Sequence, residues 1–340
     1  MKASLARLLA AVSCFAAVGA QAQEQDWNKV VEAAKKEGTV LVYHAQLGAP
    51  HWKAVVKAFI DKYGVQVQEF DARASEMTER IRTEQTSSRY VADVEFHGEA
   101  SIVEQRRTEY VAKHGGVPNM ANVTAPFAPN EYSIPAWVQV VCALVNTNKV
   151  KPADEPKSWK DLLDPKWKGQ ILSDDMRAVG SGQTMFGVFH KTPSLGPDYL
   201  RKLKDQNLVI GRDLQLNSRR IAQGEYAIFA QQIIAFASDL KALPVKVVLP
   251  EEGCPYTLIE GAILRGAPHP NAARLFINHL LDAESQLTYA KAWMGVTTRG
   301  VAERLTDPDA KRFAQVKLLG GIKFEEREAM LKAATEMYSN

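Results

Sequence analysis

The sequence predicts an α/β protein of two lobes, each lobe an open and mostly parallel sheet flanked by helices. Strands and helices alternate along the first third of the chain, at the spacing of right-handed βαβ units. Two extended segments, Trp137–Val145 and Val245–Leu249, enclose a further α/β region. We interpret these segments as two hinge strands that cross between the lobes. The length of 340 residues is too great for one small core and is ordinary for two lobes.

The alternating elements follow from hydrophobic periodicity. Apolar residues from Trp27 to Ala34 recur at i, i+3, i+4 and i+7, the pattern of an amphipathic helix, and Gly38 ends it. The run 39–43 is continuously apolar or β-branched, which is typical of a strand buried on both faces of a parallel sheet. The expected strands are 39–43, 65–70 and 91–96, and the helices expected after them are 52–63, 75–87 and 99–110, with a last helix over 324–338.

The first 22 residues have the pattern of a secretory signal peptide. Lys2 and Arg7 give a positive start, and the apolar run 8–18 follows. The small residues of Ala20-Gln21-Ala22 predict cleavage after Ala22. A membrane-spanning helix needs about 20 apolar residues, more than this run provides. We therefore expect an exported, periplasmic protein.

The two crossings interrupt both lobes in sequence. We expect a first lobe of residues 23–135 plus 250–299 and a second lobe of residues 136–249 plus 300–340. Each lobe is then discontinuous along the chain, and the two segments that join them form the hinge.

Composition and motifs argue against several function classes. Lys plus Arg number 42 against 39 Asp plus Glu, spread along the chain, so we expect no basic face for nucleic acid. Cys-x-x-Cys, nucleotide-binding glycine loops and His-Glu-x-x-His do not occur in the sequence. Gly180-Ser181-Gly182 superficially resembles a nucleophile elbow, but we interpret it as a turn that caps a helix. We therefore expect a protein that is not an enzyme and uses no catalytic residue, cofactor or metal. A secreted α/β hydrolase or transferase stays as the alternative of another class.

Polar residues recur just beyond the carboxyl ends of the predicted strands, the edge where open α/β sheets bind their ligands. Cationic and amide groups predominate among them. Free N–H groups at a helix start around Ser181 and Gly182 would add to an anion site. The candidate ligand-binding residues are Tyr43, His44, Gln46, Arg73, His97, Arg177, Ser181, Gly182, Arg219 and Gln231.

Arginine is the residue type on which an anion hypothesis rests most. Its planar guanidinium pairs bidentately with carboxylate or phosphate and stays charged. We favour Arg177 as a ligand contact over Arg73 and Arg219. The alternative is that these arginines form surface salt bridges with nearby aspartates, which contribute only about 0–1 kcal/mol each.

Two long segments carry a resemblance to a known family. Ser158–Ile171 reads SWKDLLDPKWKGQI and Ala267–Ile277 reads APHPNAARLFI. Both resemble segments of the periplasmic solute-binding proteins of ABC importers, in the ferric-ion-binding cluster, and the similarity runs from about Val40 to Arg299. The resemblance implies a two-lobed type II periplasmic binding-protein fold whose lobes close around a ligand. It also implies an inner-membrane ABC permease as partner, and we expect the protein to be a monomer.

The ligand set of the iron-binding members is not carried over. Those members have two adjacent tyrosines shortly after a Gly-Glu turn, because ferric iron needs anionic oxygen ligands. Here Gly224-Glu225 supplies the turn, but none of the ten tyrosines is adjacent to another. Relatives without the pair are similar to importers of organic anions, so the resemblance implies an organic carboxylate, a phosphate ester or a phosphonate. The alternative is ferric iron bound through Tyr43, His44 and acidic groups with a synergistic anion.

Two cysteines stay after removal of the signal peptide. Cys142 lies in the first crossing segment, and Cys254 follows the turn that leads into the return strand. The family resemblance suggests that these strands are neighbours near the hinge, and an exported location favours oxidation. We therefore predict a disulfide, with two buried free thiols as the alternative. A Cα separation above about 7 Å would contradict the disulfide.

Overall fold

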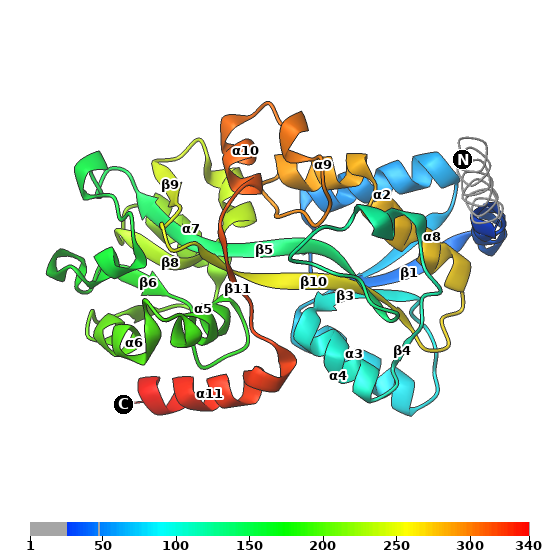
Figure 1. Cartoon of the computed structure of the whole chain (residues 1–340), viewed down its shortest axis with the longest axis horizontal. Coiled ribbons are helices and arrows are strands. Elements are labelled where there is room, and N and C mark those ends of the chain that lie inside the picture. The colour runs from blue at the N-terminus through cyan, green and yellow to red at the C-terminus, as the bar shows by residue number, and fades with distance from the viewer. Residues whose placement is uncertain (1–25, 47, 340) are drawn as a thin grey trace, which may run out of the picture.

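The structure, a computed structural model, describes residues 26–46 and 48–339, so the predicted signal peptide lies outside the described residues. The described chain forms one mixed sheet of 11 strands with helices on both faces (Figure 1). The strands are β1 (Thr39–His44), β2 (Gln66–Asp71), β3 (Val94–Gly98), β4 (Val111–Ala112), β5 (Ser133–Asn146), β6 (Ile171–Ser173), β7 (Val209–Ile210), β8 (Ile228–Ile233), β9 (Val245–Val248), β10 (Cys254–Leu264) and β11 (Leu318–Gly320).

A helix over 26–37 precedes β1, as predicted. The later helices are α2 (Pro50–Tyr63), α3 (Ala74–Thr86), α4 (Glu99–Arg107), α5 (Ser181–Lys191), α6 (Gly196–Lys204), α7 (Leu214–Ala222), α8 (Pro270–Leu280), α9 (Ala283–Lys291), α10 (Pro308–Ala314) and α11 (Phe324–Tyr338). Short 3-10 helices are η1 (Pro118–Asn122), η2 (Pro152–Asp154), η3 (Trp159–Leu163), η4 (Pro165–Trp167), η5 (Ile234–Leu240) and η6 (Ala302–Arg304).

The predicted elements of the first third are confirmed, with two shifted boundaries. Strand β3 begins at Val94 rather than Val91, because the buried carboxylate of Asp93 accepts the Leu41 N–H at 2.7 Å in place of a strand partner. Helix α4 ends at Arg107 rather than Tyr110, since Glu109 adopts a left-handed backbone with φ of 60°. A left-handed residue cannot continue a right-handed helix.

The first lobe is built on the parallel strands β2, β1 and β3. Helices α2 and α8 cover one face of these strands around Trp52, Phe59 and Phe276. Helices α3 and α4 cover the other face around Ile81 and Ile102. Because the three strands are parallel, their carboxyl ends lie at one edge of the lobe, and the segments that follow them share that edge.

The second lobe is built on the parallel strands β7, β6 and β8. Its core holds Trp159, Phe186 and Phe189, with α5 and α6 packed together. The carboxyl ends of β6 and β8 lead into residues 174–182 and into η5, so this lobe also presents strand ends and helix starts at one edge.

Strands β5 and β10 join the lobes. They pair antiparallel from Ser133↔Ala262 to Val140↔Tyr256, and β10 also pairs with β3 while β5 pairs with β8 (Figure 1). The first predicted crossing is therefore confirmed and the second was wrong. Residues 245–248 form β9, which pairs only with 143–146 of β5 at the far end of the second lobe. A strand of four residues is too short to pass between the lobes, whereas the 11 residues of β10 are long enough.

The predicted disulfide is confirmed. Cys142 of β5 and Cys254 of β10 are bonded, with Cα atoms 5.4 Å apart, and both side chains are fully buried. The bond closes a separation of 112 residues and fastens the two long strands to each other at their second-lobe ends.

The C-terminal segment bridges the two lobes. Strand β11 pairs with the start of β10, and α11 then packs mainly against α5 and also against α4 (Figure 1). Arg107 of α4 pairs with Glu325 at 2.7 Å, and Lys191 of α5 pairs with Glu326 at 2.5 Å. The first turn of α11 is thus bonded to both lobes.

Candidate ligand-binding site

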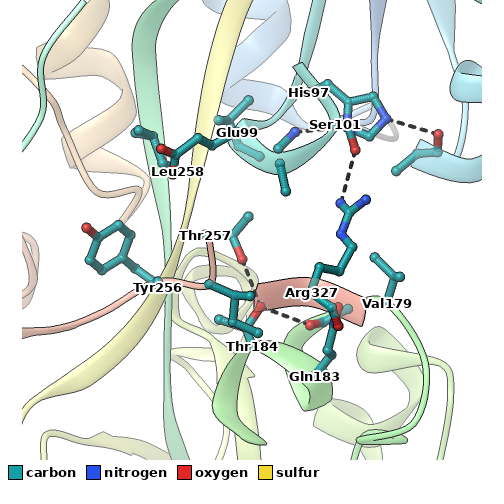
Figure 2. A pocket seen from close by; sticks show the side chains of 17 residues that line it. His97, Glu99, Ser101, Val179, Gln183, Thr184, Tyr256, Thr257, Leu258 and Arg327 are labelled. Atoms are coloured by element: carbon teal, nitrogen blue, oxygen red, sulfur yellow. Dashed lines mark hydrogen bonds between the residues drawn. The ribbon is translucent and has the colours of Figure 1, made fainter. Parts of the chain in front are cut away.

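Two cavities lie where the strand ends of the lobes face each other. The α4–α5 cavity, of about 200 Å³, is lined by residues of the β3–α4 junction, α5, β10 and α11, among them His97, Glu99, Gln183, Thr184, Thr257 and Arg327 (Figure 2). The α2–α7 cavity, of about 250 Å³, is lined by residues of the β1–α2 loop, α7 and η5, among them Gln46, His51, Ser218, Arg219, Phe236 and Asp239.

The N-terminus of α4 opens onto the α4–α5 cavity. Strand β3 passes directly into this helix through Gly98, which has no side chain to cap it. The first N–H groups of a helix have no partner within the helix, and the helix dipole makes that end attractive to negative charge. This end of α4 is therefore available to an anion.

His97 is held neutral beside that helix end. Its Nδ1 accepts the Gly98 N–H at 2.9 Å, so the ring proton lies on Nε2, 3.1 Å from the carbonyl oxygen of Ala74. Burial, together with the nearby Arg327, lowers the pKa of His97 to about 4, against the opposing effect of the hydrogen bond to the Ala74 carbonyl. The ring therefore lines the cavity as a hydrogen-bonding group without charge at neutral pH.

Arg327 supplies a cation from α11. Its Nη2 donates to the Ser101 Oγ at 3.2 Å, and the nearest carboxylate oxygen, of Glu104, is 3.8 Å from Nη1. Burial lowers the pKa of this guanidinium, although it stays far above neutral. An arginine that is largely shielded from water and only loosely paired is a ready partner for an anion.

Glu99 brings a carboxylate to the same cavity. It forms no hydrogen bond or ion pair within the described part of the chain, and burial raises its pKa. Figure 2 shows Glu99 and Arg327 on different sides of the lining, with Thr257 between the two lobes.

The N-terminus of α5 is occupied by the protein itself. The Asp174 Oδ2 accepts the Ser181 hydroxyl and the Gly182 N–H, each at 2.9 Å, and Oδ1 accepts the Asp175 N–H. The Asp174 N–H in turn donates to the Gln231 Oε1 at 3.0 Å. Two of the predicted ligand-binding residues, Ser181 and Gly182, thus bind an internal carboxylate where the sequence predicted an anion, and a third, Gln231, accepts the backbone N–H of the same aspartate.

Arg177 is paired with a neighbouring aspartate. Its Nε lies 2.9 Å from the Asp175 Oδ1, and Arg212 reaches the Asp175 Oδ2 at 2.7 Å. Hydrogen bonds from the two guanidinium groups hold the pKa of the Asp175 carboxyl well below its usual range. Arg177 lines neither cavity, and its pairing is the alternative that the sequence left open.

The α2–α7 cavity holds two of the predicted residues, Gln46 and Arg219. The Gln46 Oε1 lies 3.2 Å from the His51 Nε2, and burial lowers the pKa of His51. Arg219 is exposed and forms no ion pair among the residues that the structure describes. Asp239 provides a carboxylate in the same lining.

Three further predicted residues, Tyr43, His44 and Arg73, also line neither cavity. The buried Tyr43 hydroxyl donates to the Glu84 Oε1 at 2.7 Å, and burial raises its pKa, which disfavours a phenolate ligand for iron. His44 is buried, with its Nε2 2.9 Å from the Glu69 Oε1 and its ring tilted against that of Trp52 at a centroid distance of 4.4 Å. Arg73 is exposed at the start of α3. No group of three or more metal-ligating side chains is found over 26–46 and 48–339.

The sequence did not single out Glu99, Arg327, His51 and Asp239. Glu99 follows β3 directly, so the rule that located His97 could have included it. Arg327 had no such signal, because only the packing of α11 across both lobes brings it to the cavity.

No helix among the described residues is long and apolar enough to span a membrane.

Two α/β lobes on a pair of hinge strands, with cavities between them that contain charged and hydrogen-bonding side chains, define a binding protein that closes around a small ligand. The chain belongs to the bacterial extracellular solute-binding protein family, which it matches over residues 54–312. The resemblance to the solute-binding proteins of ABC importers is thereby confirmed.

Curated relatives agree with this class. The chain is 24% identical over 259 residues to a Salmonella typhimurium protein named "Putative 2-aminoethylphosphonate-binding periplasmic protein", covering 71% of this chain and 72% of that protein. It is 27% identical over 208 residues to the Escherichia coli spermidine/putrescine-binding periplasmic protein, covering 56% of each. It is also 30% identical over 148 residues to an uncharacterized Haemophilus influenzae protein, of which it spans only 43%.

Solved structures share the fold. A substrate-binding protein of an ABC transporter from Agrobacterium tumefaciens aligns with a TM-score of 0.74 and 16% identity, covering 88% of this chain and 94% of that one. Iron-bound HitA from Pseudomonas aeruginosa aligns with a TM-score of 0.69 and 22% identity, covering 87% and 99%. AfuA from Actinobacillus pleuropneumoniae, with fructose-6-phosphate bound, aligns with a TM-score of 0.67 and 19% identity, covering 89% and 99%. The predicted type II fold is therefore confirmed.

Proposed function

We propose that the protein is the periplasmic solute-binding component of an ABC importer and captures a small anionic solute, such as an organic carboxylate, a phosphate ester or a phosphonate. The observation that carries this proposal is the α4–α5 cavity, where the loosely paired Arg327 lies beside the uncapped N-terminus of α4. The guanidinium and the helix end both favour negative charge. A solute anion would complete the pairing of Arg327.

Two of the similar proteins support a solute with an anionic group. One is named for 2-aminoethylphosphonate, and the AfuA structure holds fructose-6-phosphate. The polyamine named for the Escherichia coli relative carries the opposite charge, so the charge of the solute is the property to test first.

Capture would proceed by closure of the lobes about β5 and β10. Open and closed forms of such proteins differ by a few kcal/mol, and a ligand that touches both lobes favours the closed form. The α4–α5 cavity has walls from both lobes, since His97 lies at the end of β3 whereas Gln183 and Thr184 lie on α5. A solute there would bind the closed form more tightly than the open form.

The remaining assignments follow from the same proposal. Residues 23–135 plus 250–299 would form one lobe and 136–249 plus 300–340 the other, apart from β5 and β10, which run between the two lobes. The protein would act as a monomer in the periplasm, with its signal peptide cleaved after Ala22, and would deliver its solute to an inner-membrane ABC permease without chemical conversion.

A thermal-shift screen tests the proposal directly, because a ligand that binds only the native state raises the apparent stability. We would screen small carboxylates, phosphate esters and phosphonates against polyamines and ferric citrate, and confirm each hit by calorimetry. Stabilisation by an anion, lost in Arg327→Gln, is the expected result. An effect of Arg219→Gln instead would place the anion in the α2–α7 cavity. A response to polyamines or ferric citrate alone would overturn the anionic class.

A further inference from the structure

The α4–α5 cavity presents one charge of each sign. Arg327 and Glu99 both line it, and Figure 2 shows them on different sides, Arg327 directed to Ser101 and Glu99 directed to Leu258. Their side chains are not bonded to each other. Each therefore keeps a charge that a ligand, rather than the opposite residue, could pair.

Neither charge is satisfied by the surrounding protein. Arg327 has the Ser101 hydroxyl at 3.2 Å and the Glu104 carboxylate no closer than 3.8 Å. Glu99 has no hydrogen bond or ion pair within residues 26–46 and 48–339. Burial raises its pKa, Lys323 lowers it and Glu325 raises it, but neither of these two residues is bonded to it. A partly desolvated charge without a close partner is costly, so each is expected to gain from a ligand.

Glu99 has a second explanation that must be separated from ligand binding. It is the acidic residue in the first turn of α4, where a carboxylate stabilises the helix dipole. That role would need no ligand, and it would make Glu99 repel a simple anion at the same helix end. A ligand that carries its own cation would remove the repulsion.

Resting on the proposed function, we infer that the solute is a small zwitterion, whose anionic group pairs with Arg327 and whose ammonium group pairs with Glu99. Arg327 lies on α11, beyond residues 54–312 that match the family. Specificity for the anionic end would thus come from a helix outside the matched part of the chain, and α11 would be a wall of the site.

The test compares three probes of the same carbon skeleton by calorimetry at pH 7: 2-aminoethylphosphonate, ethylphosphonate and ethylamine. We expect the wild-type protein to bind the zwitterion at least about tenfold more tightly than ethylphosphonate, and ethylamine least. Glu99→Gln is expected to abolish the preference for the zwitterion over ethylphosphonate. Arg327→Gln is expected to weaken both phosphonates by about tenfold or more.

Matched controls come from the exposed ion pair of Arg304 and Glu284, which joins η6 to α9 at 2.5 Å outside the cavity lining. Arg304→Gln and Glu284→Gln make the same chemical changes and should leave the order of the three probes unchanged. Equal binding of the zwitterion and ethylphosphonate, with Glu99→Gln without effect, would overturn the zwitterion and leave the anionic solute standing. If no anion of the wider screen binds the wild-type protein, the proposed function fails, and the zwitterion fails with it.

Discussion

The starts of α4 and α5 face the same inter-lobe region, yet the protein treats them differently. At α5 the Asp174 carboxylate accepts bonds from Ser181, Gly182 and Asp175, and that helix end is closed. At α4 the residue before the helix is Gly98, and the helix end is open to a cavity. Whether the N-terminus of a helix can bind a solute anion therefore depends on whether a nearby side chain, such as Asp174 at α5, already accepts bonds from its N–H groups.

The charges around the two helices differ in the same way. On the α5 side, Asp175 is paired by Arg177 and Arg212. On the α4 side, Glu95 is fully buried, and among the described residues its one hydrogen-bond donor is Gln105 at 3.0 Å. Glu260 likewise accepts only the Ser133 hydroxyl, at 3.0 Å, within that part of the chain. Asp175 is thus paired inside the protein, whereas burial favours the protonated form of Glu95 and Glu260.

Removing the internal carboxylate should produce the largest effect. Asp174→Ala leaves two buried N–H groups and one hydroxyl without their acceptor, so we expect a loss of about 3 kcal/mol in the free energy of unfolding, measured in urea. Asp213→Ala is the control, because Asp213 caps the exposed start of α7 with a single bond to the Leu216 N–H, and its loss should not exceed about 1 kcal/mol. Equal losses in the two variants would contradict a special role for Asp174.

The buried carboxyl groups on the α4 side should make the free energy of unfolding depend on pH. Burial raises the pKa of Glu95 to about 8 and that of Glu260 to about 7, so both are protonated in the fold at pH values where the unfolded chain has lost the proton. The contribution of these two protonated carboxyl groups to the free energy of unfolding is fully present below about pH 4.5 and is lost as the pH rises towards 8. Stability should therefore fall between these values.

Glu95→Gln isolates this contribution, because the amide stays neutral at every pH. The stability of the variant relative to wild type should rise by about 1 kcal/mol per pH unit between pH 5 and 7 and level off above pH 8. Asp175→Asn should behave oppositely: ion pairs lower the pKa of Asp175, so its contribution is present at neutral pH and disappears in acid. A pH-independent difference for Glu95→Gln would mean that Glu95 is ionised in the fold.

Much of the fold could be predicted because its signals are local. The α2 helix ends at Gly64 in a left-handed conformation with φ of 71°, and the apolar run of β1 lies between two parallel neighbours. The second crossing strand could not be located in this way. Residues 245–248 and 254–264 are both extended, and only their partners distinguish a short edge strand from one that joins the lobes.

The site was predicted less completely, for a physical reason. Strand ends are local features, so His97 at the end of β3 and Gln46 just after β1 could be placed at the inter-lobe edge, whereas Arg219 reaches it from within α7. The pairing of a charge is not local: Arg177 could face a ligand or Asp175, and composition does not decide between them. Arg327 reaches the cavity only because α11 packs on both lobes.

Replacing Arg177 should have the smallest effect on stability, and its effect on anion binding should differ most clearly from that of replacing Arg327. Because Arg177 is about one-third exposed and shares Asp175 with Arg212, we expect Arg177→Ala to cost less than about 1 kcal/mol of stability. Its calorimetric dissociation constant for an anion identified by the screen should match wild type, whereas Arg327→Gln should weaken the same anion about tenfold. A tenfold weakening by Arg177→Ala would mean that Arg177 exchanges Asp175 for the solute when the lobes close. The anion would then bind on the α5 side, and the proposed site beside Arg327 and the start of α4 would be wrong.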